Sequence, residues 1–543
     1  MKYPISLILL LFTSISIQAQ SRYWVFLDEA EMGLSPASAT LPALSPTGIE
    51  RRIRQGIPLK PSDFPVPAEA IARVQATGAQ VYRVSRWFRA VTVYATEAQL
   101  AELTATQGVR GVQPVARMQI SRWSESPDAS IPALNLAGSS PVPDDGLTSY
   151  SYGQSLDQVS QINLIPLHDA GYTGLGVNVA LMDGGFSGVE SHACFTGAWN
   201  QNRIVLTHDF VDNDSNVFQA GSHGMSVLST ICSDLDGTFI GTAPEANYFL
   251  FRTEDEYSET LVEEDNWVVA AEWADSLGVD VINTSLGYTT FDNGIGDHSY
   301  ADLDGRTAVI SRAATAAART GMIVVVAAGN EGSSAWKYIS CPADADSIFS
   351  VGAVDGLGVR AGFSSQGPTA DGRTKPDIAT RGSSATIMKS SGTVGTGSGT
   401  SFASPIACGA MACLVQAHKS TNSALSIQDL MNLVRSEASQ ASKPDSLLGW
   451  GIPNFGSTLA VMGIDEPSLV PEWSLRPQGQ GYALHRTRPT GMTLVRRYDF
   501  SGRLLEEWTL SAGTMPQILA SQPMMTFLQI DAEEPLVLKV PAF

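Results

Sequence analysis

Hydrophobic residues follow three different patterns along this chain, and the changes of pattern divide it into regions. Between residues 21 and 117, short apolar segments such as RYWVFL and VRGVQPV alternate with polar ones, and VYRVSRWFRAVTVYA predicts a pair of strands. The segment TEAQLAEL begins with Thr96 and Gln99, the spacing of a helix capping box. This first pattern predicts a small α+β domain over residues 20–117.

From about residue 151 the apolar segments become continuous and rich in β-branched residues, and helical segments separate them. Examples are VNVALMD, ANYFLFRTE, VDVINTSLG, MIVVVAAGN and IFSVGAVD, with the helix-like VEEDNWVVAAEWADSLG between the second and the third. Strands that are buried on both faces have this composition. The pattern therefore predicts an α/β domain, with a parallel sheet and helices on both faces, over residues 151–462.

Stretches rich in Pro, Ser, Gly and Asp interrupt these patterns. Residues 118–150 predict a linker, and IDEPSLVPEW after residue 462 predicts a second one. Beyond it, short alternating segments (GYALHR, MTLVRRYDFSGRLLEEWTL, MMTFLQIDA and PLVLKV) predict a C-terminal antiparallel β-sandwich over residues 463–543. Residues 1–19 have the layout of a secretory signal peptide, with Lys2 before the apolar run ISLILLLF. We therefore expect an exported protein with no transmembrane segment in its mature part.

The overall composition fits a folded protein with a large core. Of the 543 residues, 43% are hydrophobic and 16% are charged. The net charge of -20 is uneven, because residues 21–117 hold eleven Lys or Arg and eight Asp or Glu, a net of +3, whereas residues 118–543 carry -24. The acidic part argues against nucleic acid as a partner. The two parts could attract each other, although ordinary solubility charge explains the difference equally well.

The cysteines offer neither a disulfide framework nor a zinc motif. Cys408 and Cys413 fall in an apolar segment rich in Ala and Gly, where we expect buried hydrophobic side chains. No CxxC pair is present. Two of Cys194, Cys232 and Cys341 could still form one disulfide, because an exported protein can contain disulfide bonds, but the sequence does not show which two.

The stretch GTGSGTSFASP leads from a glycine-rich loop into the apolar segment IACGAMACLVQAHK. Ser401 would lie at the amino end of that helix, where unpaired N–H groups stabilise negative charge. A serine hydroxyl becomes a nucleophile when a histidine takes its proton and an acid orients that histidine. His223 begins another helical segment in GSHGMSVLSTI, and Asp183 ends a strand in VALMDGGFSG. Taken singly, each of these two residues is more often a cap or a turn residue.

The order Asp183, His223, Ser401, together with the sequences around them, resembles the three signature regions of the subtilisin-like serine proteases. The resemblance implies a subtilisin-like parallel sheet for residues 151–462. It also implies a secreted serine endopeptidase, which hydrolyses peptide bonds by an Asp–His–Ser triad through an acyl-enzyme intermediate.

Two further segments match the same family. Asn330 in VVVAAGNEG resembles the asparagine of the oxyanion hole, which binds the tetrahedral intermediate. In NTSLGY, Ser285, Leu286 and Gly287 resemble the strand that pairs with the substrate backbone and walls the pocket for the residue before the cut.

The resemblance extends to both sides of the peptidase domain. Residues 20–117 are similar to the inhibitory propeptide of that family, which would make the chain a zymogen with its own propeptide as a partner. The segment YDFSGRLLEEWTL resembles the sorting tails of type IX secretion. The implied partners are therefore protein or peptide substrates, the propeptide and the type IX machinery, and the implied location is secreted or at the cell surface.

Some features depart from the family or carry no further chemistry. Met225 follows His-Gly where most members have Thr or Ser, which affects only local packing. The loop DFVDNDSN spaces Asp212, Asp214 and Asn216 like calcium ligands, but Val217 stands where an EF-hand loop needs Gly. We interpret this loop as a polar turn, and we expect no metal and no cofactor.

The acidic run EDEYSETLVEEDNW, residues 254–267, allows two interpretations. It could line the cleft and favour basic substrates, or it could be the solvated first turn of a helix, whose amino end favours Asp and Glu. We expect the second, and therefore little effect on specificity.

Two other functions are disfavoured by the sequence. An inactive peptide-binding scaffold would be favoured if a triad position were replaced, and none is. An α/β-hydrolase esterase needs GxSxG at its serine, whereas residues 399–403 read Gly-Thr-Ser-Phe-Ala and the order of the triad differs.

Overall fold

The computed structural model describes residues 21–34, 42–117, 150–294, 296–420 and 425–462, together with seven strands between Trp473 and Val540. The signal peptide predicted for residues 1–19 lies outside the described residues, as does the linker predicted for residues 118–150 except for its last residue.

A seven-stranded parallel sheet lies at the centre of the largest domain, in the order β13-β12-β11-β10-β5-β9-β6. Its strands are β5 (Asn178–Asp183), β6 (Ile204–Asp209), β9 (Asn247–Arg252), β10 (Val281–Thr284), β11 (Ile323–Ala327), β12 (Phe349–Val354) and β13 (Ile378–Arg381). The five predicted strands are confirmed. The two edge strands β6 and β13 escaped the sequence analysis, because β6 is only partly buried and two of the four residues of β13 are polar.

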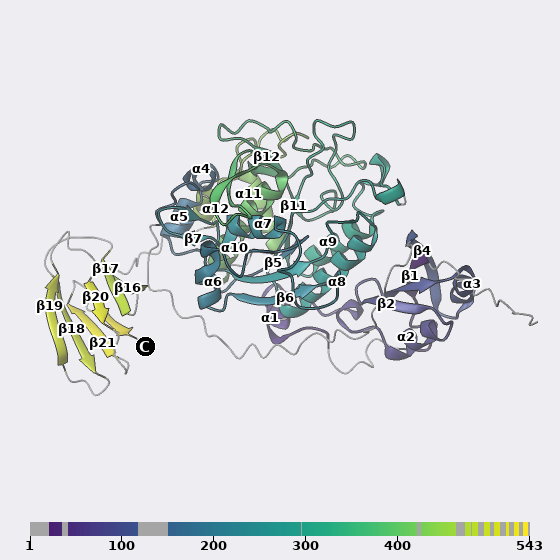
Figure 1. Ribbon diagram of the computed structural model, residues 1–543, viewed down its shortest axis with the longest axis horizontal. Coiled ribbons are helices and arrows are strands. Elements are labelled where there is room, and N and C mark those ends of the chain that lie inside the picture. The colour runs from purple at the N-terminus through teal and green to yellow at the C-terminus, as the bar shows by residue number, and fades with distance from the viewer. Residues whose placement is uncertain are drawn as a thin grey trace, which may run out of the picture.

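Helices cover both faces of this sheet, as predicted (Figure 1). Helices α7 (His223–Cys232) and α10 (Thr400–Ser420) share one core with Val179 and Leu181, whereas α8 (Val262–Leu277) and α9 (Val309–Arg319) share a second core with Ala180 and Met182. Successive residues of a strand point to opposite faces, so β5 contributes to both cores. Smaller elements complete the domain: α4 (Leu156–Gln161), α5 (Ile165–Asp169), α6 (Thr196–Asn200), α11 (Ile427–Ser436), α12 (Phe455–Val461) and the hairpins β7–β8 (Asp234–Leu235, Phe239–Ile240) and β14–β15 (Ala385–Met388, Val394–Gly397).

Helix α10 fills the core on its face of the sheet. Among the described helices it alone is long and apolar enough to cross a membrane, but 94% of its most apolar window is buried inside the protein, and a core helix passes the same test. Its small residues allow close packing: a β-carbon on Gly409 would lie 2.0 Å from Thr242 Oγ1. All five cysteines are buried and free, so the disulfide left open by the sequence is not formed.

Residues 21–117, here called the N-terminal region, form a four-stranded antiparallel sheet in the order β2-β3-β1-β4. Its elements are β1 (Ser21–Leu27), α1 (Pro46–Arg54), α2 (Ala68–Gln75), β2 (Gln80–Ser85), β3 (Ala90–Ala95), α3 (Glu97–Ala105) and β4 (Val109–Arg117). The predicted capping box of α3 is present, since Thr96 Oγ1 accepts from Gln99 N at 3.3 Å and Thr96 N donates to Gln99 Oε1 at 2.8 Å. Helices α2 and α3 pack on one face of the sheet through Val74 and Leu103.

The other face of this small sheet packs against α8 and α9 (Figure 1). Trp24 and Val115 belong to the same core as the two helices. Buried ion pairs also cross the contact, with Arg22 3.2 Å from Asp265 and Arg86 2.6 Å from Asp275. The basic N-terminal region and the acidic domain thus meet through opposite charges, which was one of the two interpretations of their uneven charge.

The C-terminal strands form two antiparallel sheets, in the orders β16-β17-β20 and β19-β18-β21-β22. They are β16 (Trp473–Gln478), β17 (Gly481–Arg486), β18 (Thr493–Asp499), β19 (Leu504–Leu510), β20 (Gln517–Ala520), β21 (Thr526–Asp531) and β22 (Leu536–Val540). The predicted segments are strands, but the sandwich itself stays a prediction, because it requires the two sheets to pack face to face.

Candidate active site

The predicted site residues lie at strand ends and helix starts along one edge of the parallel sheet. Asp183 is the last residue of β5, and Ser285 and Asn330 follow β10 and β11. Since β10 lies between β5 and β11 in the sheet, their carboxyl ends are neighbours. His223 is the first residue of α7 and Ser401 is the second residue of α10.

Asp183 and His223 form a direct hydrogen bond, with Nδ1 of the histidine 2.8 Å from Oδ1 of the aspartate. The aspartate is fully buried, whereas the histidine side chain is 38% exposed. The pKa of His223 is raised to about 9, because the charge of Asp183 outweighs the lowering effect of burial, and Glu254 and Glu256 add to the rise. The bond to Nδ1 leaves Nε2 as the nitrogen available for proton transfer.

Glycine at position 224 allows this contact. A β-carbon on Gly224 would lie 2.6 Å from Gly185 O and 2.9 Å from Asp183 Cβ. Any larger residue would push the start of α7 away from the end of β5. The Gly that follows His223 in the sequence is therefore a packing requirement of the Asp183–His223 pair.

Ser401 is 8% exposed and is held by hydrogen bonds with Ser285. Its hydroxyl donates to Ser285 O at 3.2 Å, and its carbonyl accepts from Ser285 Oγ at 2.9 Å. The structure therefore brings Asp183 and His223 into contact, but no hydrogen bond joins Ser401 to His223 within the described residues. Catalytic hydrogen bonds are often incomplete without substrate, and a rotation of the hydroxyl would change its acceptor.

Asn330 presents an amide donor beside Ser401. Its Oδ1 accepts from Thr400 N at 2.9 Å and from Thr400 Oγ1 at 3.1 Å. Because a backbone N–H can only donate, the amide oxygen must face Thr400 and the amide nitrogen must face away from it. Asn330 Nδ2 has no hydrogen bond within the described residues, so it can donate to a substrate oxygen.

A cavity of about 110 Å³ opens next to the serine. The three residues predicted to bind substrate line it, and so do Gly329, Asn330, Glu331 and Ser401. A β-carbon on Gly287 would lie 2.0 Å from Ser340 Oγ, so the glycine lets the wall of the cavity approach its neighbour. The arrangement suits one substrate side chain beside the nucleophile.

Sequence reasoning missed the polar network beneath the serine. Ser404 Oγ donates to Asn283 Oδ1 at 2.9 Å, and Asn283 Nδ2 donates to Ser285 Oγ at 3.0 Å. These side chains are buried, and Ser285 in turn bonds Ser401 O. The available signal was a polar residue inside an apolar segment, namely Asn283 in VINT and Ser404 in the helix.

The interpretation of residues 254–267 as a solvated helix start is wrong. Helix α8 begins only at Val262, and its first-turn acids are buried: Glu263 is 2% exposed, Glu264 1% and Asp265 1%. The N-terminal region covers part of this turn through Arg22, which lies 3.2 Å from Asp265. Glu254 and the residues after it form a loop before the helix.

The DFVDNDSN loop uses its polar side chains within the protein. Asp214 Oδ1 accepts from Asn216 N at 2.7 Å, and Asn216 Oδ1 accepts from Phe218 N at 3.1 Å, both of which are Asx turns. Asp212 Oδ2 lies 2.8 Å from a guanidinium nitrogen of Arg252.

Comparison with known proteins assigns the family. The profile of the subtilase family, peptidase family S8, matches residues 174–451, so the chain belongs to the subtilase family. A second profile, the peptidase S8 propeptide domain of Bacteroidota, matches residues 22–129 and reaches into the predicted linker.

Individual relatives agree with this assignment. Subtilisin E of Bacillus subtilis (strain 168) is 33% identical over 276 residues, which is 50% of this chain and 64% of the relative. The subtilisin of Bacillus pumilus is 33% identical over 265 residues, 48% of this chain and 84% of the relative. The match thus spans less than two thirds of subtilisin E. A solved structure of the prenylagaramide maturation protease PagA covers 55% of this chain and 98% of its own, with 22% identity and a TM-score of 0.44.

Proposed function

We propose that this chain is a secreted serine endopeptidase, made as a zymogen, that hydrolyses peptide bonds of protein or peptide substrates. The observation that supports it most is the 2.8 Å bond between Asp183 and His223, with Ser401 at the start of α10 and a free amide donor on Asn330 beside it. Secretion is supported by the signal-peptide pattern of residues 1–19 and by the resemblance of the C-terminal segment to type IX sorting tails.

In the proposed reaction, the Ser401 hydroxyl turns from Ser285 O toward His223 Nε2 and attacks the peptide carbonyl. His223 takes the hydroxyl proton and then gives it to the leaving amine, so that an acyl-enzyme remains for water to hydrolyse. Asp183 holds the imidazole in the right tautomer and stabilises its cation. Asn330 Nδ2 and the amino end of α10 stabilise the oxyanion.

The substrate is proposed to lie along residues 285–287 as an extended strand, with the side chain before the cut in the cavity beside Ser401. Residues 21–117 are proposed to act as an inhibitory propeptide that the enzyme removes from itself. Their contact with α8 and α9 would hold them on the domain before cleavage.

The decisive experiment measures hydrolysis of a quenched-fluorescence peptide library and labelling by a fluorophosphonate probe. We expect Ser401→Ala to lose both, while the control Ser391→Ala, in the exposed β14–β15 turn, keeps both. Asn330→Ala should keep the labelling site but lose about 10²–10³ in kcat, the loss that removal of one oxyanion donor causes in subtilisin. Equal hydrolysis by the parent and Ser401→Ala would refute the proposal.

A further inference from the structure

The loop between β9 and α8, residues 253–261, begins directly beside the triad acid. Strand β9 lies next to β5 in the sheet, with Arg252 opposite Asp183. One residue further, Thr253 N donates to Asp183 O at 3.0 Å. The loop therefore leaves the sheet at the same edge as Asp183, and Glu254 is its first acidic residue.

Two glutamates of this loop lie against the glycines next to the catalytic pair. A β-carbon on Gly184 would lie 3.2 Å from Glu256 Cγ and 3.5 Å from Glu254 Oε2. A β-carbon on Gly221 would overlap the carboxyl group of Glu256, at 1.6 Å from Oε1. The charges of both glutamates act on His223, whose pKa they help to raise. These carboxyl groups therefore lie beside the catalytic pair.

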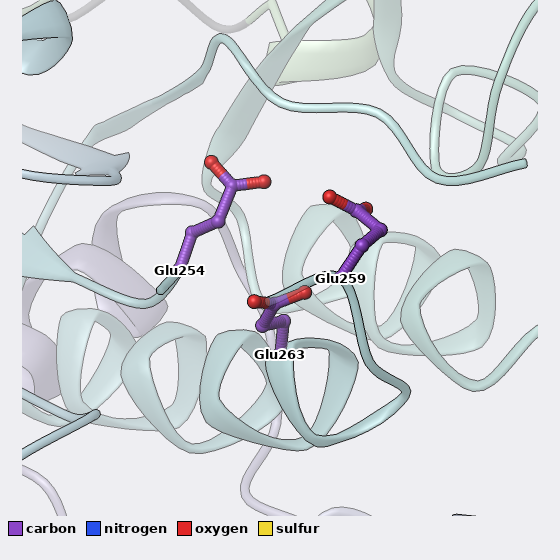
Figure 2. A group of neighbouring side chains, drawn as sticks. All are labelled: Glu254, Glu259 and Glu263. Atoms are coloured by element: carbon purple, nitrogen blue, oxygen red, sulfur yellow. The ribbon is translucent and has the colours of Figure 1, made fainter. Parts of the chain in front are cut away.

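Glu254 also belongs to a group of three carboxyl groups at the start of α8. One oxygen from each of Glu254, Glu259 and Glu263 lies within 4.8 Å of the other two, and Figure 2 shows the three side chains gathered there. Burial is the main cause that raises their pKa values, to about 8 for Glu254, about 7 for Glu259 and about 9 for Glu263. Carboxylates buried together in this way are destabilised unless a cation accompanies them.

The charge of His223 lowers the pKa of Glu254 but does not offset the effect of burial, and no ion pair among the described residues neutralises the group. None of Glu254, Glu256, Glu259 and Glu263 forms an ion pair with a basic side chain of the described residues. Arg252, which precedes the loop, instead lies 2.8 Å from Asp209 and from Asp212.

Tyr288 independently indicates a ligand at this place. It is fully buried, and its hydroxyl has no hydrogen-bond partner within the described residues. Its pKa is raised well above the usual value, by burial first and then by the charges of Glu254, Glu263 and Glu259, so these carboxyl groups act on its hydroxyl. Tyr288 also follows directly on Gly287, the last residue of the proposed substrate-binding strand. Tyr288 is therefore adjacent in sequence to the proposed substrate strand and is influenced by the charges of the acidic group.

We propose that Glu254, Glu256, Glu259 and Glu263 bind a Lys or Arg side chain of the substrate, at a position other than the one that enters the cavity beside Ser401. This inference rests on the proposed function. In this proposal, a substrate strand along residues 285–287 extends one of its side chains toward the carboxyl groups beside the catalytic pair, where Glu254 and Glu256 lie against Gly184. Its guanidinium or ammonium group would form charge-assisted hydrogen bonds with them.

A divalent cation is the competing ligand for three carboxyl groups. Both carboxyl oxygens of Glu263 already accept backbone N–H groups, from Asp255 at 3.1 Å and from Thr260 at 3.0 Å. Glu254 and Glu259 are only half-buried, and Glu254 lies against Gly184, beside the catalytic pair. These features favour a substrate side chain over an enclosed metal ion.

The test uses the processed enzyme, with active sites counted by a serine-directed inhibitor. Peptide pairs that differ only in arginine or its uncharged isostere citrulline are compared at each position around the cut. We expect arginine to be preferred at least about tenfold in kcat/KM at one position, and Glu254→Gln and Glu259→Gln each to lower this ratio several-fold. The control Asp255→Asn removes a carboxyl group of the same loop that bonds Tyr257 N and faces Arg252, and it should keep the ratio.

The outcomes separate this inference from the proposed function. Hydrolysis that depends on Ser401 but shows a ratio near one at every position, in the parent enzyme, overturns the inference alone. Loss of the Ser401 dependence overturns both. If calcium chloride raises the Tm of the parent but not of Glu259→Gln, and arginine is not preferred, the group is a metal site and the inference is wrong. The preference of the parent enzyme for arginine over citrulline tests the inference by itself. The inference can therefore be tested even if a variant fails to fold.

Discussion

Two buried carboxyl groups of helix α8, Asp275 near its C-terminal end and Glu263 at its start, have opposite electrostatic environments. Near its C-terminal end, Asp275 is fully buried and contacts three arginines of the N-terminal region: Arg51, Arg52 and Arg86. Burial by itself would raise the pKa of Asp275, but the charges of these arginines outweigh it and the pKa is lowered. The carboxylate is therefore ionised and fully paired.

At the start of the same helix, Glu263 lies with Glu254 and Glu259 and has no basic partner within the described residues. Burial there raises the pKa of Glu263 to about 9. The difference teaches that burial alone does not decide the charge of an acid; the supply of cations does. For Asp275 the propeptide-like N-terminal region supplies them, and for Glu263 and its two neighbours we propose that the substrate does.

The strongest test of this comparison is whether the enzyme cuts off the N-terminal region, which carries the three arginines that contact Asp275. We expect the parent protein to cut itself after residue 117 and before residue 155, whereas Ser401→Ala should keep residues 21–117 attached. The variant should also lose about 10⁶ in kcat, as loss of the serine does in subtilisin. Intact-mass measurement of both purified proteins shows the cut.

Trimming of both proteins at the same place and rate, with host proteases excluded, would contradict self-processing by Ser401. A parent that stays whole and fully active would show that the N-terminal region is not an inhibitory propeptide.

A second prediction removes the paired carboxylate at the C-terminal end of α8. In the uncut Ser401→Ala background, Asp275→Ala removes the one carboxylate that all three arginines contact, and Asp63 remains as a partner for Arg52 and Arg86 only. We expect a loss of about 3–5 kcal/mol in the free energy of unfolding, measured by urea denaturation. The matched control Glu50→Ala removes an exposed acid of α1, and it should change this free energy by less than about 0.5 kcal/mol. Equal effects of the two substitutions would mean that the arginine contact contributes nothing.

The contrast between the two ends of α8 also shows where sequence reasoning fails. Charged residues in the segment VEEDNWVVAAEWADSLG suggest exposure, yet the partners that bury Asp275 come from far away in the chain; Arg52 is 223 residues distant. Local patterns predicted the five inner strands and the capping box of α3, because those depend on neighbouring residues. The pairing of α8 with the N-terminal region depends on tertiary packing, which no local pattern carries.

The candidate site also has features that the sequence predicts and features that depend on tertiary packing. Asp183, His223 and Ser401 could be predicted from their order and their signature sequences. The bond from the Ser401 hydroxyl to Ser285 O could not, because it depends on one side-chain rotation. The contact of Glu256 with Gly221 could not be predicted either, because nothing in the sequence shows that this glycine leaves room for its carboxyl group.

The third prediction concerns the pH dependence of stability, to which Glu254 and Asp275 should contribute with opposite signs. The folded-state pKa of Glu254, about 8, lies above its ordinary value of 4.5, so its ionisation destabilises the fold as the pH rises from about 5 to 8. Glu254→Gln does not titrate and should be more stable than the parent at pH 9, by about 1 kcal/mol, but not at pH 5.

The pKa of Asp275 is lowered, so the stability that its ionised form contributes is present above its ordinary pKa of 3.8. This contribution is lost as the pH falls through the lower folded-state pKa. Thermal unfolding at several pH values measures both, and a Glu254→Gln variant that is less stable than the parent at pH 9 would contradict the first.

The smallest effect expected is a shift in the pH dependence of catalysis. His223 must be neutral to act as a base, and its pKa is raised to about 9 by the charges of Asp183, Glu254 and Glu256. The acid limb of kcat/KM for an uncharged peptide should therefore lie near pH 9 in the parent. Around pH 9 Glu254 is itself ionised, since its own pKa is about 8, so its charge acts where His223 titrates. Glu254→Gln should thus move the limb to lower pH, whereas Asp255→Asn should leave it in place. A parent limb below about pH 7, or a limb that Glu254→Gln does not move, would show that the carboxyl groups at the start of α8 do not act on His223.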